Sequence, residues 1–201
     1  MGAQHSQNLE AWFCHVPGLK VVMPSEPADA KGLLKAAIRA DDPVLFIETT
    51  ALLTARGDVP GGDHITPIGV AEVKRVGSDI TLVAIGRFVA RALEAAELLG
   101  SEGISVEVVD PRTLQPLDFD TILDSVEKTG RLVVTHEAPA PFGFGAEVCA
   151  VVAAQAFDRL SAPPRRVAAP FTNIPVSVPL AEQRIPTAAD IAAVVRETVR
   201  W

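Results

Sequence analysis

The chain has 201 residues, of which 48% are hydrophobic and 21% are charged, and its formal net charge is −7. This composition is sufficient to bury a core in one large or two small domains. The negative charge and the lack of a Lys/Arg cluster argue against a nucleic-acid partner. No apolar run approaches the roughly 18 residues of a spanning helix, and no signal pattern opens the chain, which predicts neither membrane insertion nor secretion.

The first 56 residues are predicted to hold few regular elements. We expect a helix near residues 8–14, a short buried strand at 20–23 and a second strand at 44–47. Between the strands, Pro27 opens a helix with apolar positions at helical spacing. These positions are Ala30, Leu33, Leu34, Ala37 and Ile38. Two strands alone leave edges that need partners, so this segment is expected to be an incomplete domain.

The two cysteines, Cys14 and Cys149, lie in apolar helical settings and form no C-x-x-C motif. Such positions favour reduced, buried thiols over a disulfide or a zinc site. We therefore expect a cytoplasmic protein.

Periodicity is lost after residue 48, and glycines and prolines gather before residue 68, which predicts a linker at residues 57–67. Beyond it, strands and helices alternate. Strands are expected at 80–85, directly before Asp110, at 132–135 and at 165–168, and helices at 119–128 and about 146–160. A further helix has Val89, Ala92, Leu93 and Ala96 on one face. The alternation predicts an α/β domain with parallel strands over residues 68–201.

The last helix has its own start signal. Thr187, with Asp190 three residues on, resembles a capping box, and an apolar stripe follows. We expect this helix to pack on the second domain.

The segment from Asp110 to Asp118, DPRTLQPLD, follows the carboxyl end of a predicted strand. Loops in this position line the ligand crevice of open α/β sheets, which makes it a candidate site. A structural role is the alternative: Asp110 pairs with Arg112 across the turn, prolines stiffen it, and Asp118 caps the next helix.

This segment resembles the D-x-R-T-x-x-P-x-D signature of E1 β subunits of thiamine-diphosphate-dependent 2-oxo acid dehydrogenases. The family includes the β subunits of pyruvate, branched-chain 2-oxo acid and acetoin dehydrogenases. Three more segments match it in order: GAQHSQNLEAWFCHVPGLKVVMPSEPADAKGLL from Gly2, PVLFIE from Pro43 and GSDITLVAIG from Gly77. The resemblance implies that residues 1–56 are the last part of a pyrimidine-binding domain and 68–201 a complete transketolase-like C-terminal domain. A complete β subunit is longer, so it also implies a truncated or split subunit.

His5 is the candidate catalytic residue. By itself, an imidazole beside Ser6 and Gln7 is typical of a surface histidine. The resemblance instead implies that the histidine of this HSQ segment faces the thiazolium ring of the cofactor and the acyl group. The ordinary pKa of histidine, near 6.5, suits proton transfer there. We hypothesise that His5 assists reductive acylation of the lipoyl group.

The resemblance implies thiamine diphosphate with Mg as the cofactor. The chain contains no G-D-G motif for the Mg-diphosphate, which the family places on its α subunit, and the activating glutamate of the family lies in the missing β segment. Glu10 and Glu48 are not expected to replace that glutamate, and Glu10 is expected to be a solvated or interface carboxylate. No cofactor-binding residue is therefore assigned to this chain.

A structural potassium ion is a further implication of the resemblance, through the turn after the helix that Pro27 opens. The matching positions are Ala37, Ile38, Ala40 and Asp42, mainly through backbone carbonyls. Carbonyls at a helix C-terminus are unsatisfied and attract cations. The alternative is a plain C-cap before Pro43.

Gly143 and Gly145 form a G-x-G-x-x-V run that lacks the third glycine of a dinucleotide fingerprint. We expect these glycines to allow close packing of the following helix. Similar positions in the family imply that His136 and Glu137 belong to a subunit contact.

The resemblance implies three partners: an E1 α subunit, a second β subunit and the E2 lipoyl acyltransferase. Phe171 stands where many members carry an aspartate that contacts E2, which weakens the docking prediction, although the terminal carboxylate of Trp201 could attract a basic domain. The predicted function is therefore that of an E1 β subunit or a fragment of one, inactive as an isolated chain. The alternative is a non-catalytic assembly or regulatory module.

Overall fold

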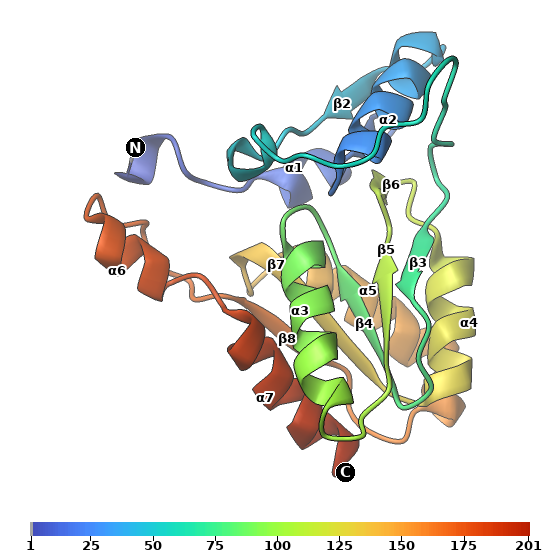
Figure 1. Cartoon of the computed structure of the whole chain (residues 1–201), viewed down its shortest axis with the longest axis vertical. Coiled ribbons are helices and arrows are strands. Elements are labelled where there is room, and N and C mark those ends of the chain that lie inside the picture. Colours follow the sequence, from blue (N-terminus) through green and yellow to red (C-terminus); the bar gives the residue numbers. More distant parts are fainter. Residues whose placement is uncertain (1) are drawn as a thin grey trace.

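The computed structural model describes residues 2–201, which form two β-sheets flanked by helices. The smaller sheet has three strands in the order β2-β1-β6, and the larger sheet has five in the order β3-β5-β4-β7-β8. In Figure 1 the N-terminal segment, in blue, lies at one end of the larger sheet. The predicted α/β class is confirmed.

The strands are β1 (Lys20–Val22), β2 (Val44–Phe46), β3 (Glu72–Arg75), β4 (Ile80–Ala84), β5 (Val106–Asp110), β6 (Thr113–Gln115), β7 (Leu132–Pro139) and β8 (Arg165–Ala169). The helices are α1 (Glu10–Cys14), α2 (Pro27–Arg39), α3 (Phe88–Gly100), α4 (Phe119–Thr129), α5 (Phe144–Gln155), α6 (Val178–Gln183) and α7 (Ala188–Val199). Short 3-10 turns lie at Gly2–Gln4, Thr50–Leu52 and Phe157–Arg159.

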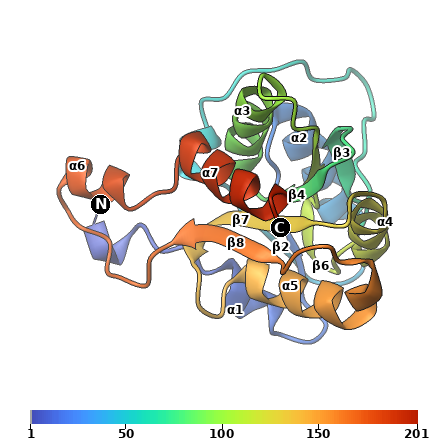
Figure 2. The same ribbon diagram turned by 90° about the horizontal axis from the view of Figure 1, so that it is seen from below.

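The larger sheet is mostly parallel and is covered on both faces. Strand β4 pairs in parallel with β5 and β7, β7 pairs in parallel with β8, and β3 is an antiparallel edge strand. Every residue of β4 and β5 is buried, which explains their apolar runs. Helices α3 and α7 pack on one face and α4 and α5 on the other, and Figure 2 shows strands β7 and β8 between α7 and α5.

Capping residues begin or end several helices at the positions that the sequence predicted. Asp118 caps α4, its carboxylate accepting a hydrogen bond from the Thr121 backbone N–H at 3.0 Å, and α4 ends at Gly130 with φ of 69°. At α7, Thr187 and Asp190 form the predicted capping box. Both caps are therefore confirmed.

Several elements differ from the sequence prediction, among them β6, a strand within the segment that was expected to be a loop. Strand β3 was not expected, because its charged sequence suits a half-buried edge and gives no apolar run. Helix α6 was also not expected; Figures 1 and 2 show it standing away from the sheet. Helix α5 ends at Gln155 and a 3-10 turn follows, so the predicted extension to residue 160 is wrong.

The smaller sheet takes one strand from the second half of the chain. Strand β1 pairs in parallel with β2 and antiparallel with β6, which belongs to the DPRTLQPLD segment. The edge of β1 that sequence analysis left open is thus covered from a distant part of the chain. Within the described residues, β2 has no strand on its other side.

Helix α2 buries only part of its apolar face. Leu33 is fully buried, whereas Leu34 is 46% exposed and Ile38 is 75% exposed. No element of residues 2–201 covers these two side chains, which agrees with the expectation of an incomplete first domain.

Both cysteines have free thiols, as predicted, and both are half-buried. Burial raises the pKa of Cys14 and of Cys149 to about 11. Among residues 2–201, no helix combines the length and apolar character that a bilayer crossing requires.

Candidate functional site

A cleft of about 560 Å³ lies where the N-terminal segment meets the larger sheet. One wall comes from the chain before residue 52 and the other from Arg87 and Glu137. Arg87 follows β4 and Glu137 lies near the end of β7, so both stand at the carboxyl edge of parallel strands. The lining residues are His5, Ser6, Gln7, Asn8, Leu9, Glu10, Phe13, Met23, Leu45, Ile47, Glu48, Thr49, Thr50, Ala51, Arg87 and Glu137.

His5 lines this cleft and is exposed, in the loop that follows the first 3-10 turn. Glu48, which directly follows the second predicted strand, is also exposed on the lining. The structure therefore brings the predicted catalytic histidine to the cleft. Its catalytic role stays a prediction.

Glu10 lies inside the protein, and the expectation of a solvated or interface carboxylate is wrong for this chain. The residue begins α1, which packs on β1 and β6, and it is only 3% exposed. Burial raises the pKa of Glu10 above its ordinary value, and the nearby Glu137 carboxylate raises it further. The cleft wall thus contains a carboxyl group that tends to hold its proton.

Arg87 and Glu137, which form the second wall of the cleft, make a bidentate ion pair with each other. The Nε and Nη2 atoms of Arg87 donate to the two carboxylate oxygens of Glu137, and each side chain is 21% exposed. Sequence analysis missed Arg87. A basic residue directly after a buried strand is the signal that could have found it.

His136, next to this pair, is fully buried, and neither ring nitrogen has a hydrogen-bond partner among residues 2–201. Burial lowers the pKa of His136 to about 4. A Cβ on Gly143 would lie 2.7 Å from His136 Cε1, and one on Gly145 would lie 3.1 Å from His136 Nε2. Close packing through these glycines is confirmed. The prediction that His136 contacts another subunit is wrong for its side chain, because the ring has no exposed surface, whereas the predicted contact of Glu137 stays a prediction.

The predicted pairing of Asp110 with Arg112 is wrong for the side chains. Asp110 accepts hydrogen bonds from Ser25 Oγ at 2.5 Å and from the Arg112 backbone N–H at 2.9 Å. The Arg112 guanidinium turns to Asp29 and Glu72, with both distances at 3.1 Å. The backbone of Arg112 is left-handed, with φ of 57°, which aims its side chain away from Asp110.

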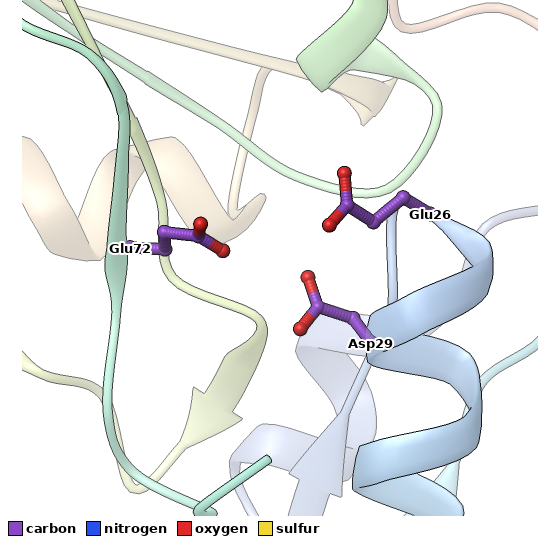
Figure 3. A group of neighbouring side chains, drawn as sticks. All are labelled: Glu26, Asp29 and Glu72. Carbon is purple, nitrogen blue, oxygen red and sulfur yellow. The ribbon is translucent and has the colours of Figure 1, made fainter. Parts of the chain in front are cut away.

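Three carboxylates, those of Glu26, Asp29 and Glu72, converge near this loop (Figure 3). Such a group could hold a metal cation, but in this chain the ammonium group of Lys74 lies among the three carboxylates. Lys74 Nζ lies 3.0 Å from Glu26, 3.2 Å from Asp29 and 2.5 Å from Glu72. Burial opposes the charge of Lys74, but hydrogen bonds to Glu72 and Glu26 raise its pKa above the ordinary value. The cluster is an ion-pair network between α2 and β3.

The predicted potassium ligands lie at the end of α2. Ala40 is the C-cap residue, and its N–H donates to the Ala37 carbonyl at 3.3 Å. The Asp42 carboxylate pairs with Lys20 at 2.8 Å. The Ala37 carbonyl and the Asp42 carboxylate thus already have partners within the chain. Potassium binding through Ala37, Ile38, Ala40 and Asp42 stays a prediction.

Comparison with known proteins gives two family matches. Residues 69–191 match the family described as transketolase, C-terminal domain, and residues 1–55 match transketolase, pyrimidine binding domain. The fold is thus a partial pyrimidine-binding domain followed by a transketolase C-terminal domain, as predicted. The chain belongs to the transketolase C-terminal domain family.

Within this family, the chain is homologous to E1 β subunits of 2-oxo acid and acetoin dehydrogenases. It is 50% identical to the β subunit of acetoin:2,6-dichlorophenolindophenol oxidoreductase from Cupriavidus necator, covering 98% of this chain and 59% of that protein. It is 44% identical to the pyruvate dehydrogenase E1 component subunit β of Rhizobium meliloti, covering 98% and 43%. The chain thus spans little more than half the length of the former and less of the latter.

A solved structure described as a split gene transketolase, inactive beta4 tetramer, shares the fold. Its TM-score is 0.83 with 29% sequence identity, over 99% of this chain and 64% of that chain.

Proposed function

We propose that this chain is the β component, or a part of it, of an E1 enzyme that decarboxylates a 2-oxo acid and passes the acyl group to lipoamide on an E2 acyltransferase. The observation that carries the proposal is the cleft that His5 and Glu10 line together with Arg87 and Glu137. The sequence relationship to E1 β subunits supports the same conclusion. Cytoplasmic location is part of the proposal.

Thiamine diphosphate would supply the carbanion chemistry of such an enzyme. The lining residues do not fit the diphosphate end of this cofactor: Arg87 is committed to Glu137, and the sequence lacks the G-D-G motif. In the described part of the cleft, the remaining ionisable groups are His5 and carboxyl groups. We therefore place the diphosphate and its Mg on an α subunit, which makes the active site composite.

His5 is the residue of this chain that we assign to the chemistry. An exposed imidazole at the rim can reach a bound acyl group and can donate or accept a hydrogen bond there. Glu10 lines the same cleft, and its largely buried carboxyl group accepts a hydrogen bond when charged and can donate one when protonated. These two groups can orient an oxygen atom of the substrate and exchange a proton with it.

The proposed assembly contains the α subunit, a second β subunit and E2. Phe171 is 77% exposed and Trp201 is 72% exposed, so both are accessible for docking of E2. A phenylalanine cannot form the ion pair that an aspartate offers at that position. We therefore do not assign E2 docking to an ion pair at Phe171.

A non-catalytic assembly or regulatory module is the second candidate. Exposed Leu34 and Ile38 and the unpaired edge of β2 favour it, since they describe a first domain that lacks its covering layer within residues 2–201. Such a module would form a complex with an α subunit without turning over substrate.

The experiment that separates these candidates is co-expression with a candidate α subunit. Thiamine-diphosphate-dependent reduction of an artificial electron acceptor is then measured with pyruvate, branched-chain 2-oxo acids and acetoin. Activity with any of these supports the enzyme and identifies its substrate. A stable but inactive complex supports the module, and failure to form a complex contradicts both.

The role of His5 is tested in the same complex. His5→Ala is expected to lower turnover by about 100-fold, the usual effect of removing a proton-transfer group. His15→Ala is the matched control, because His15 is exposed at the end of α1 and does not line the cleft. A loss of about five-fold or less, or an equal loss in both variants, would remove His5 from the chemistry.

A further inference from the structure

We infer that Arg112 is a positioning residue for the cleft: it clamps the N-terminal segment, residues 2–56, against the larger sheet and thereby sets the distance between the cleft walls. The inference rests on the proposed function in that it takes this cleft as the site of the chemistry. Arg112 itself is outside the lining.

The loop that carries Arg112 crosses from the larger sheet to the N-terminal segment. It leaves β5 at Asp110 and continues into β6, which pairs with β1. The N–H of Met23 donates to the Arg112 carbonyl at 2.9 Å, and Ser25 Oγ donates to Asp110 at 2.5 Å. Both contacts join residues that lie at least 85 positions apart in the chain.

The Arg112 guanidinium ties three segments together. Its Nη1 donates to Asp29 on α2 and to Glu72 on β3, both at 3.1 Å. Its Nε and Nη2 donate to the Val70 carbonyl at 3.2 and 3.0 Å. A planar guanidinium can satisfy carboxylates and a carbonyl at once, a geometry that a lysine cannot reproduce. Removing it therefore breaks the bonds that Arg112 makes to α2, β3 and Val70, and the ion pairs between α2 and β3 then depend on Lys74.

Charge makes this contact between the two parts of the chain costly to break. The Asp29 side chain, seen in Figure 3 next to Glu26 and opposite Glu72, is 5% exposed. Its cationic partners are Lys74 at 3.2 Å and Arg112 at 3.1 Å. Without Arg112, one cation would face three carboxylates, and a buried carboxylate that loses a partner destabilises its surroundings.

Met23 connects the clamp to the cleft. It is hydrogen-bonded to Arg112 through its backbone, it lines the cleft, and its Cε lies 2.6 Å from where a Cβ on Gly86 would stand. Gly86 directly precedes Arg87 of the opposite wall. A shift of the N-terminal segment would therefore move Met23 and the His5 wall away from Arg87 and Glu137.

The alternative is that Arg112 only stabilises the second domain, since Val70 and Glu72 belong to it. Cys14 distinguishes the two roles. This thiol lies on α1 and packs against a cluster that includes Val83 and Val109 of the larger sheet. Burial raises its pKa from 9.0 to about 11, so exposure to water would increase the reactive thiolate at pH 8 by up to ~100-fold. Cys149, on α5, is the internal reference for general unfolding.

The test compares thiol modification rates of the wild-type chain with those of Arg112→Ala, Arg112→Lys and Arg196→Ala. Arg196→Ala is the control, because it removes a bidentate ion pair with Glu102, at 2.6 Å, on the surface of the second domain. We expect Arg112→Ala to raise the Cys14 rate by about ten-fold or more while Cys149 changes by less than about two-fold. Arg112→Lys should lie between Arg112→Ala and the wild type.

The second measurement uses the complex with the α subunit. Arg112→Ala should lower kcat/KM by about ten-fold, mostly through a higher KM. The reason is that the residues on the two walls of the cleft are displaced from the positions in which they bind the substrate. Arg196→Ala should behave as the wild type.

An unchanged Cys14 rate in Arg112→Ala would overturn the clamp, and equal acceleration of both cysteines would reduce Arg112 to a stabilising residue. A faster Cys14 with unchanged kcat and KM would overturn the positioning role. An inactive wild-type complex would refute the proposed function instead, and the Cys14 rate would then decide the clamp by itself.

Discussion

Replacement of Asp110 by asparagine is expected to change how stability depends on pH. The carboxyl group at the end of β5 has no exposed surface, and burial raises its pKa from 3.8 to about 7, against the hydrogen bonds from Ser25 and the Arg112 backbone. Between these two values the folded chain holds a proton that the unfolded chain has released. The stabilisation is therefore complete below pH 3.8 and is lost as the pH rises through about 7.

The difference between the two pKa values corresponds to about 4 kcal/mol of unfolding free energy. Three other buried groups also contribute to the pH dependence. Glu10, whose pKa is raised, acts in the same direction, whereas Glu107 and His136, whose pKa values are lowered, act in the opposite one. All three remain in the variant. The difference between the two stability curves therefore isolates Asp110.

The assay is urea unfolding followed by circular dichroism between pH 4 and 8, for the wild type and Asp110→Asn. The wild type should lose about 4 kcal/mol relative to the variant across this interval. Asp124→Asn, an exposed position on α4, is the control and should follow the wild type. Parallel curves for the wild type and Asp110→Asn would refute the reasoning. If Asp110→Asn fails to fold, Ser25→Ala should extend the loss of stability to higher pH, because it removes a hydrogen bond that favours the charged carboxylate.

Two further substitutions test local parts of the fold by the same unfolding measurement. Asp118→Ala should cost about 1–2 kcal/mol, since its carboxylate caps α4 and also accepts the N–H of Ala71 at 2.8 Å; no loss would show that water replaces both bonds. Gly143→Ala should cost about 1–3 kcal/mol, because its Cβ would stand 2.7 Å from the buried ring of His136. Gly61→Ala, with open space around it, should be neutral, and an equal effect in both glycine variants would contradict the packing argument.

Sequence patterns predicted the larger sheet well where burial is uniform. Strands β4 and β5 have every residue buried, and a strand covered on both faces appears as an unbroken apolar run. The caps Asp118 and Thr187 were predictable because a cap joins residues three positions apart. Strand β3 escaped prediction since an edge strand with charged, half-buried residues has no such pattern.

The residues of the candidate site were harder to predict from local sequence patterns. His5 was found through resemblance to a family, because a histidine in a polar loop has no periodicity to mark it. Arg87 and Glu137 lie 50 positions apart, and no local rule pairs them. The wrong expectation for Glu10 has the same origin, since its burial depends on α1 packing against β1 and on β6 from the far part of the chain.

The sequence by itself determined the α/β class, the parallel core strands and the helix caps of this protein, because each depends on residues that are neighbours in the chain. Only the tertiary structure decided which charges meet: Arg112 with Asp29, Arg87 with Glu137, and Lys74 with three carboxylates. The physical reason is that the state of a charged side chain depends on its solvent exposure and on its partners. Both are set by segments that fold against it from elsewhere.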